Sequence, residues 1–194
     1  MASGSQKVIY AALIGNGLIA ITKFIAAAIT GSSAMLSEGI HSVVDTGNQV
    51  LLLHGIRKSR KRPDARYPFG HGKEIYFWSF VVAILIFAVG AGISMYEGIL
   101  HLLKPQPVEH PFVNYAVLAA AIVFEGVAWS MAFREFSREK GRKGYIEAVQ
   151  TGKDPAMFVV LFEDSAAMLG LFVAFIALLL GQVTGNLYFD GAAS

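Results

Sequence analysis

Five apolar stretches, each near or above the length that crosses a bilayer, constrain this chain more than any other feature. They cover residues 8–30, 34–56, 75–103, 112–133 and 156–180. A helix needs about 20 apolar residues to cross the hydrocarbon core. Composition agrees, because 55% of the residues are hydrophobic and 15% are charged, which is too apolar for a soluble core of this size. The sequence therefore predicts an all-α, multi-pass membrane protein.

A sixth apolar stretch begins at Tyr188 and is cut off by the last residue, Ser194. We therefore expect residues 1–194 to form one transmembrane domain, without a cytoplasmic C-terminal domain in this chain. The chain is expected to be a fragment of a longer protein. The first stretch is long enough to span and lacks a small-residue cleavage pattern, so it is expected to be a retained helix.

Basic residues are concentrated in alternate loops. They are Arg57, Lys58, Arg60, Lys61, Arg62, Arg66 and Lys73 before the third stretch, and Arg134, Arg138, Lys140, Arg142, Lys143 and Lys153 before the fifth. The other two loops hold only Lys104. By the positive-inside rule, the basic loops and the N-terminus are cytoplasmic. Loops that set topology in a lipid bilayer are favoured here over nucleic-acid or lipid recognition, and no nucleic-acid partner is expected.

The second stretch carries polar residues on one helical face. At the helical period, Glu38, His41, Asp45 and Asn48 fall within about a 100° arc. A charge near the bilayer centre costs about 2.5–3.5 kcal/mol on insertion scales, so such residues normally face an interior cavity. This face predicts an ion or proton pathway.

The fifth stretch contains two adjacent acids, Glu163 and Asp164, which point about 100° apart and are expected to have different roles. Asp164 lies at a depth comparable to that of Asp45. A tetrahedral divalent ion takes about four nitrogen or oxygen ligands, and the chain has no cysteine to supply sulfur. If the two helices are neighbours, His41, Asp45 and Asp164 supply three ligands, and water, Glu163 or Asn48 could complete the set.

Packing is the competing interpretation, because buried polar side chains in membrane helices can simply hydrogen-bond each other. A lone His41 would favour packing, whereas His41 with Asp45 and acids on a second helix favours an ion site. Glu125 in the fourth stretch is equally compatible with a proton-coupling and a structural carboxylate. Lys23 and Asn16 in the first stretch are expected to be structural, with Lys23 pairing with an acid or reaching towards an interface.

Four motifs together resemble the cation diffusion facilitators, whose six-helix membrane domains exchange divalent metal for protons. They are the turn at residues 30–34 leading into SEGIHSVVD at 37–45, PFGHGKE at 68–74, KDP at 153–155 and EDSAAMLG at 163–170. The resemblance covers essentially the whole chain. It implies a six-helix bundle, here with the sixth helix truncated, and a homodimer.

The resemblance also implies a transport site built from two pairs of residues on the second and fifth helices. His41 and Asp45 match the first pair, and Asp164 matches the second member of the other. The position four residues before Asp164 is Val160, which cannot coordinate a metal. Glu163 can substitute, as in the branch of the family whose fifth helix reads Glu-Asp. Replacing an imidazole by oxygen or water shifts preference away from zinc.

A second family site would use Asp64, the position of Tyr67, and His71 in the loop before the third helix. Tyr67 is a poor ligand, so this site is expected to be weak or absent. His71 would then only help to shape the turn into the third helix.

These features predict a secondary transporter that exports a divalent cation from the cytoplasm in exchange for protons by alternating access. Zinc is the preferred ion, with cobalt, manganese, iron and cadmium as alternatives, and no resident cofactor is expected. Metal would displace protons from His41 and the acids, because ligation requires deprotonated groups. The other interpretations are a transport-inactive assembly protein and a divalent cation channel. An intramembrane metallohydrolase is disfavoured because the chain lacks a His-Glu-x-x-His motif, so no enzyme is expected.

Overall fold

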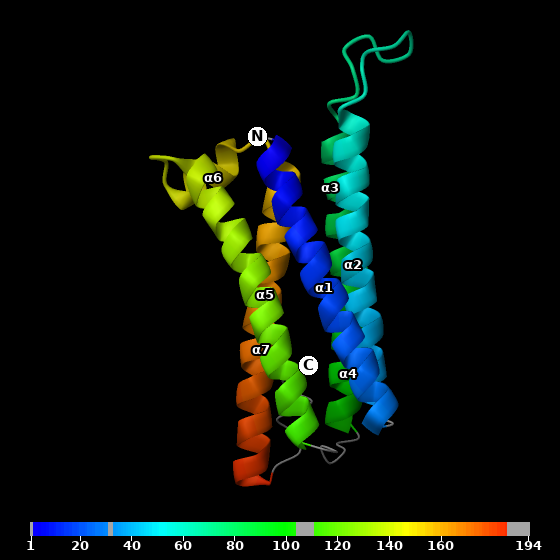
Figure 1. Cartoon of the computed structure of the whole chain (residues 1–194), viewed down its shortest axis with the longest axis vertical. Coiled ribbons are helices and arrows are strands. Elements are labelled where there is room, and N and C mark those ends of the chain that lie inside the picture. The colour runs from blue at the N-terminus through cyan, green and yellow to red at the C-terminus, as the bar shows by residue number, and fades with distance from the viewer. Residues whose placement is uncertain (1, 31–32, 104–110, 186–194) are drawn as a thin grey trace.

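The computed structural model describes residues 2–30, 33–103 and 111–185, and these residues are helical apart from short connections (Figure 1). The helices are α1 (Ala2–Thr30), α2 (Ser33–Ser59), α3 (Glu74–Leu85), η1 (Ile86–Ala91), α4 (Gly92–Leu103), α5 (Pro111–Lys140), α6 (Tyr145–Thr151) and α7 (Pro155–Thr184). The all-α fold predicted from the sequence is confirmed. The predicted sixth span lies outside the described residues.

Four helical stretches of the described chain are long and apolar enough to cross a membrane. They are Ser5–Ile29, Glu74–Leu100, Phe112–Lys140 and Pro155–Thr184. The α2 helix has 27 residues, which at the usual rise reaches about 40 Å. It differs from the other four in the polar residues along its length, which include Glu38, His41 and Asp45.

The third membrane segment is continuous but not uniform. A six-residue π-helical stretch, η1, separates α3 from α4 without a break in the chain. π-helical turns are rare and often occur at functional sites. The apolar pattern of residues 75–103 does not predict this change of helical period.

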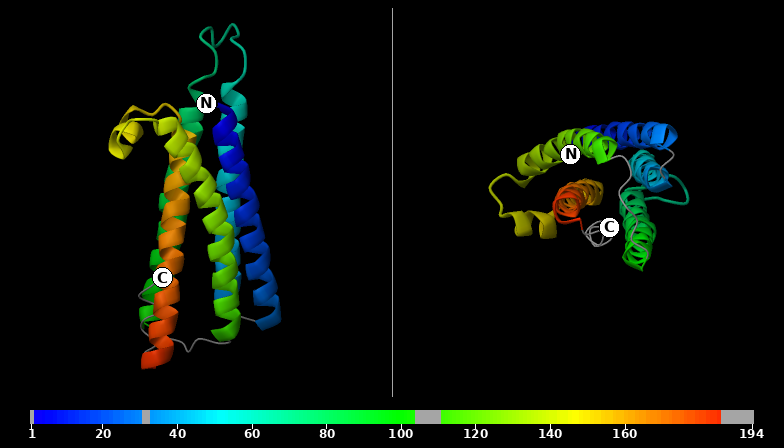
Figure 2. Two further views of the ribbon diagram at one scale, coloured as in Figure 1. Left: turned by 60° about the vertical axis from the view of Figure 1, so that its left-hand side comes forward. Right: turned by 90° about the horizontal axis from the view of Figure 1, so that it is seen from below.

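The five long segments form a closed ring. α1 packs against α2 and α5, α2 packs against α3, and α7 completes the ring between α3 and α5 while also touching α1 (Figure 2). The α2–α3 contact is tight, because a Cβ added at Gly55 would lie 2.5 Å from Cβ of Trp78. Only glycine allows that approach.

Local sequence sets where α7 begins and ends. Asp154 is its N-cap and accepts a hydrogen bond from the Met157 backbone nitrogen at 3.3 Å, while Pro155 takes the first helical position. Ser5 of α1 donates a hydrogen bond to the same Asp154 carboxylate. At the other end Gly185 has φ +68° and closes the helix in the left-handed conformation. The beginning of α7 is thus fixed to the beginning of α1.

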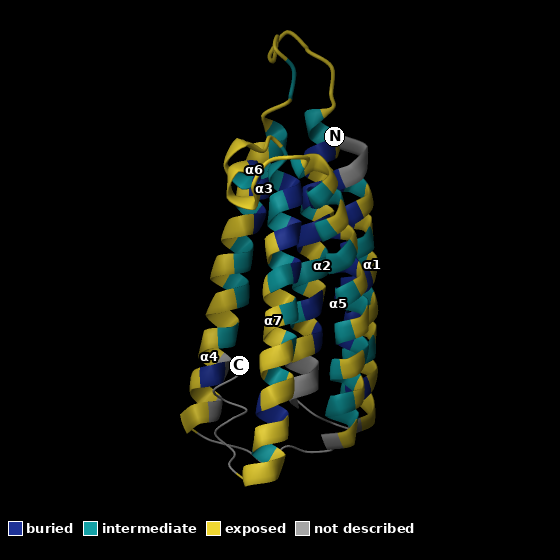
Figure 3. Ribbon diagram, turned by 90° about the vertical axis from the view of Figure 1, so that its left-hand side faces the viewer, coloured by how far each residue is buried: buried dark blue, intermediate teal, exposed yellow. Residues whose placement is uncertain are grey.

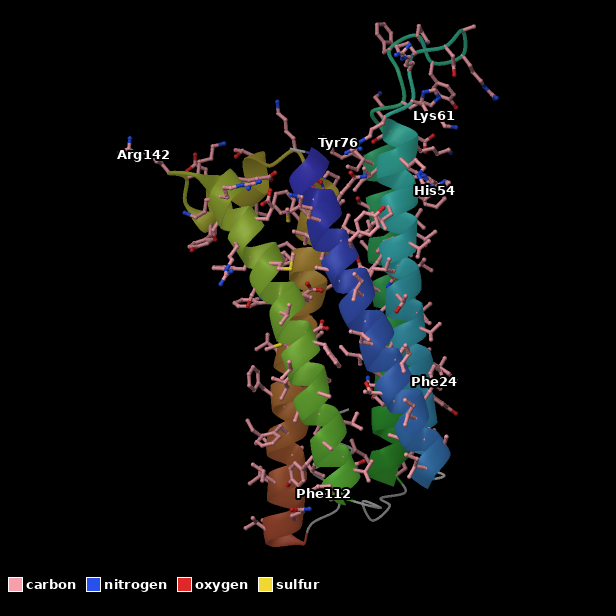
Figure 4. All side chains as sticks on the ribbon, viewed as in Figure 1. Phe24, His54, Lys61, Tyr76, Phe112 and Arg142 are labelled. Atoms are coloured by element: carbon pink, nitrogen blue, oxygen red, sulfur yellow. The ribbon has the colours of Figure 1, made fainter. Side chains whose placement is uncertain are left out.

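The N-terminus, the loop at residues 60–73 and the α5–α6 connection lie at one end of the bundle, which we call the basic end (Figure 1). Lys61 and Arg142 extend there, and Phe112 lies at the opposite end (Figure 4). The two basic loops therefore share a side of the bundle, as the charge distribution predicts.

The fourth membrane helix is longer than its apolar stretch. The predicted span ends at residue 133, whereas α5 continues to Lys140. Glu135 and Arg138, three residues apart, pair along this polar extension. The short α6 follows, and the Lys140 ammonium lies 4.6 Å from the ring centre of Tyr145.

Buried apolar side chains gather in the half of the bundle nearer the basic end (Figure 3). We call this cluster the apolar core. Its members are Val8, Ile9, Ala12, Leu52, Ile56, Val82, Ala128, Ala132, Phe136, Ala148, Ala156, Met157, Val160 and Leu161.

Candidate metal centre

Buried polar residues follow the apolar core directly on four helices. Each of these helices has a buried polar residue one turn from a member of the apolar core, on the side away from the basic end. The pairs are Ala12 and Asn16 on α1, Leu52 and Asn48 on α2, Ala128 and Glu125 on α5, and Val160 and Asp164 on α7. Three- and four-residue spacing keeps each pair on one helical face. We call the resulting group the polar layer: Asn16, Asn48, Gln49, Glu125, Glu163 and Asp164.

Glu163 joins α7 to α2 within this layer. Its carboxylate accepts hydrogen bonds from Gln49 Nε2 at 2.9 Å and from Asn48 Nδ2 at 3.4 Å. Glu163 and Asn48, the two candidates for completing the ligand set, are thus neighbours. Gln49, which the sequence pattern did not indicate, is fully buried beside them. The feature that could have indicated Gln49 is that its amide lies beside Asn48 in a membrane-length helix.

Asp164 has very different surroundings from its neighbour Glu163. Only 1% of Asp164 is exposed, and neither carboxylate oxygen has a hydrogen-bond partner among the residues that the structure describes. A buried carboxylate without a partner is costly, and nearly all buried polar groups in native structures are paired. Asp164 therefore offers two free oxygen atoms for a cation.

Glu125 brings a third helix to the polar layer. It is 4% exposed and lies close enough to interact electrostatically with Asp45 of α2 and Asp164 of α7. The α5–α7 contact is fixed beside it, because Trp129 Nε1 donates to Ser165 Oγ at 2.9 Å. Carboxyl groups from α2, α5 and α7 thus converge on the same part of the bundle.

His41 and Asp45 lie farther from the basic end than Asn48, at one-turn intervals along α2. Both are partly buried. His41 faces the third membrane segment, because a Cβ added at Gly90 of η1 would lie 3.9 Å from its Cε1 and 4.0 Å from its Nε2. At the level of Glu163, α7 meets Asn48 and Gln49 rather than His41.

Over the residues that the structure describes, no group of three or more His, Asp or Glu side chains is close enough to hold a metal ion. The set His41, Asp45 and Asp164 is therefore not assembled in this conformation and stays a prediction.

Lys23 pairs with an acid, as the sequence analysis expected. Its Nζ lies 2.8 Å from Glu38 Oε2 and 3.1 Å from Ser42 Oγ, which joins α1 to α2. Glu38, a candidate ligand, thus has a charged partner in this conformation.

The loop candidates Asp64 and His71 lie together, with His71 Nε2 3.5 Å from Asp64 Oδ2. Asp64 Oδ1 also accepts hydrogen bonds from the backbone nitrogens of Arg66 and Tyr67, each at 2.8 Å. The Tyr67 and His71 rings are 4.6 Å apart, and Gly70 adopts φ +80° between them. These contacts fit the expected turn-shaping role of His71.

Val160 belongs to the apolar core and is fully buried. Its side chain packs at the position where the family resemblance implies a second metal ligand on α7. The apolar core therefore extends to the turn just before Asp164.

Comparison with known proteins places the chain in a family. Residues 9–194 match the cation efflux transmembrane domain. The chain belongs to this family, the cation diffusion facilitators, as its four sequence motifs indicated.

Several relatives align over nearly all of the chain. It is 40% identical to the human mitochondrial proton-coupled zinc antiporter SLC30A9 over 193 residues, which is 98% of this chain and 34% of that protein. It is 31% identical to metal tolerance protein C4 of Arabidopsis thaliana, covering 98% of this chain and 42% of that protein. With the manganese efflux system protein MneP of Bacillus subtilis, identity is 30% over 98% of this chain and 61% of that protein. The chain thus spans about a third of the length of its human relative.

Proposed function

We propose that this chain forms the metal pathway of a proton-coupled exporter of divalent cations, with zinc as the preferred ion and cobalt, manganese, iron and cadmium as alternatives. The observation that carries the proposal is Asp164, a fully buried carboxylate with no hydrogen-bond partner among the described residues. Its position in a polar layer between α2, α5 and α7 suits a cation that arrives and leaves.

The proposed ligands are His41, Asp45 and Asp164, with Glu163 or Asn48 completing the set. Glu163 stands level with Asn48 and Gln49, one turn along α2 from Asp45. A relative shift of α2 and α7 by about one helical turn, roughly 5 Å, would bring Asp45 level with the α7 acids. Movements of this size between packed helices are known from conformational switches.

Alternating access then follows from the two halves of the bundle. The apolar core lies between the basic end and the polar layer, so this arrangement is closed towards the basic end. Because basic loops face the cytoplasm, we propose that it represents a state closed to the cytoplasm. Metal would bind in the opposite state and release protons from His41 and the acids, and protons would return as the metal leaves.

The choice of metal depends on the ligand types. His41 is the only imidazole among the proposed ligands, since Val160 stands at the second position where the family supplies one. Fewer nitrogen ligands favour harder ions, and a manganese efflux protein is among the relatives. A relative is also named a zinc antiporter. We therefore propose zinc first and manganese as its main competitor.

Flux measurements in liposomes test this proposal. The purified chain is reconstituted, and uptake of zinc, manganese, cobalt, iron and cadmium is followed together with internal pH. We expect flux that moves protons in the opposite direction and is lost in His41→Ala and Asp45→Asn. His54→Ala and Asp64→Asn, which change an exposed histidine on the same helix and an acid in a loop, are the matched controls and should retain flux.

Other outcomes would select another function. Flux that ignores a proton gradient would indicate a channel. Absence of flux with every ion, in protein shown to be folded, would indicate an assembly role. Full flux in Asp45→Asn would remove the proposed site. Chemical cross-linking in the same membranes tests the homodimer that we propose from the family likeness.

A further inference from the structure

A lysine inside a membrane bundle needs a reason to be there, because a cation at this depth is costly unless it is paired. Lys23 lies within the Ser5–Ile29 span of α1, and its side chain is 12% exposed. The Glu38 carboxylate balances the Lys23 charge, but the Glu38 side chain is 52% exposed. The pair is therefore asymmetric, with a buried cation and a more accessible anion.

The surroundings of Lys23 on α2 follow one helical face. Glu38 and Ser42 are one turn apart, and Lys23 Nζ contacts both, at 2.8 Å and 3.1 Å. Asp45 is the next acid on this face, and it interacts electrostatically with Lys23, as does Glu125 of α5. Lys23 thus contacts one acid of α2, Glu38, and interacts electrostatically with a second, Asp45, on the other side of Ser42.

A lysine side chain is flexible enough to move between positions one turn apart. Its ammonium group is a compact charge on a four-carbon stem with freely rotating donors. A rotamer change at Lys23 can exchange the contact with Glu38 for one with Asp45 while Ser42 remains beside it. Asp45 is available to a metal ion only when Lys23 contacts Glu38, and not when Lys23 contacts Asp45.

We propose that Lys23 is a tethered cation that competes with the transported metal for Asp45, with Glu38 as the acid that holds it aside while metal is bound. This role rests on the proposed function, because it assigns Asp45 to the metal site. The ammonium group balances the Asp45 carboxylate in the empty site and is displaced when a divalent ion arrives. Lys23 is then a positioning residue that limits affinity and helps the metal to leave.

Two substitutions that break the same ion pair separate this role from a purely structural one. Lys23→Met removes the competitor, so Zn²⁺ should bind about tenfold more tightly, by the Coulomb energy of one neighbouring cation. Glu38→Gln removes the holding acid and leaves Lys23 to Asp45, so Zn²⁺ should bind several-fold more weakly. A structural ion pair predicts the same direction of change in both variants, because each loses the same contact.

Isothermal titration of the detergent-solubilised chain with Zn²⁺, and separately with Mn²⁺, measures both changes at constant pH. Lys7→Met, which removes the same charge from an exposed position near the beginning of α1, is the matched control and should leave the dissociation constant unchanged. Lys23→Arg keeps the charge and should remain close to the wild type. In liposomes, Lys23→Met should lower both the KM and the maximal rate, because metal leaves more slowly.

Failure of this inference differs from failure of the proposed function. If the wild type binds no metal, or Asp45→Asn leaves binding unchanged, both are overturned. If binding needs Asp45 but Lys23→Met and Glu38→Gln shift affinity in the same direction, or not at all, only the role of Lys23 is overturned. Should Lys23→Met fail to fold by size-exclusion and thermal unfolding, Lys23→Gln retains a donor for Ser42 and provides the same comparison.

Discussion

On α1, α2, α5 and α7 the apolar core and the polar layer occupy neighbouring turns, yet they have opposite properties. In the core, Val160, Met157 and Leu52 are buried among other apolar side chains. In the layer, Asp164 is equally buried but lacks a hydrogen-bond partner among the described residues. One turn of α7 thus separates a well-packed residue from a buried acid of the kind that normally needs a partner. The comparison suggests that the half near the basic end holds the helices together while the layer beside it is kept ready for a cation.

The polar layer is also uneven within itself. Glu163 accepts hydrogen bonds from two amides of α2, whereas the adjacent Asp164 accepts none from the described residues. Glu163 fixes the position of α7 relative to α2 in this conformation, and Asp164 remains available. Two neighbouring acids can therefore divide the tasks of joining helices and of binding an ion.

The largest effect is expected from Asp164→Asn, which removes the charge and keeps the shape. We predict that metal flux falls by at least about 100-fold, since even indirect partners of a metal can be worth 10–100-fold. The unfolding temperature of the metal-free protein in detergent should stay the same or rise, because Asp164 makes no hydrogen bond among the described residues that the substitution would remove. Normal flux, or a marked loss of stability, would remove the contrast between the two halves.

A substitution in the apolar core should show the reverse pattern. Met157→Ala removes a side chain that is 1% exposed, and we predict a loss of about 2–5 kcal/mol in the free energy of unfolding. The dissociation constant for Zn²⁺ should change little in the fraction that remains folded. Met131→Ala, at a position 40% exposed on α5, is the matched control and should alter stability by less than about 0.5 kcal/mol. Equal losses at both positions would argue against a localised core.

Gln49→Leu tests the connection between α2 and α7. The change removes the 2.9 Å hydrogen bond to Glu163 and leaves the 3.4 Å contact from Asn48. We expect a several-fold increase in Zn²⁺ affinity, measured by calorimetry, because the proposed shift of α2 against α7 no longer has to break this hydrogen bond. Gln182→Leu removes an amide near the opposite end of α7, where it meets Tyr115, and should leave affinity unchanged. An identical response in both variants would mean that the Glu163 contacts have no special role.

The smallest effect is expected in the loop at residues 60–73. His71→Ala removes the contact with Asp64 at 3.5 Å, and metal flux in liposomes should remain within about twofold of the wild type, because this pair lies in the loop, outside the polar layer. The same assay on His41→Ala supplies the comparison inside the bundle. A loss of flux in His71→Ala as large as that in His41→Ala would move the metal site towards the loop.

Much of the fold could be predicted because it depends on single helices. Membrane-length apolar stretches locate α1, α2, α5 and α7, the Asp154-Pro155 pair marks the beginning of α7, and the basic loops indicate a common side. The polar extension of α5 and the short α6 were not predicted, because their residues do not belong to an apolar stretch. The extension instead carries polar pairs such as Glu135 with Arg138. The π-helical η1 has no signal in the apolar pattern of residues 75–103.

The candidate site was only partly predictable, because helical periodicity gives the face of a residue but not the register between two helices. It placed His41, Asp45 and Asn48 on one face of α2, and it separated Glu163 from Asp164. Helical periodicity does not predict that α7 meets α2 at Gln49 and Asn48 instead of His41 in this conformation. Register between membrane helices is set by side-chain packing along both of them.

The central claim, that the transported metal binds at the polar layer beside Asp164, is tested most directly by diffraction from crystals grown with zinc or manganese. Anomalous scattering at the absorption edge of the metal locates the ion without reference to the ligands. The account predicts a peak at bonding distance from an Asp164 oxygen, with Asp45 or Glu163 as a second ligand. A single peak at Asp64 and His71, or a fully occupied ion anywhere else in the bundle, would contradict it.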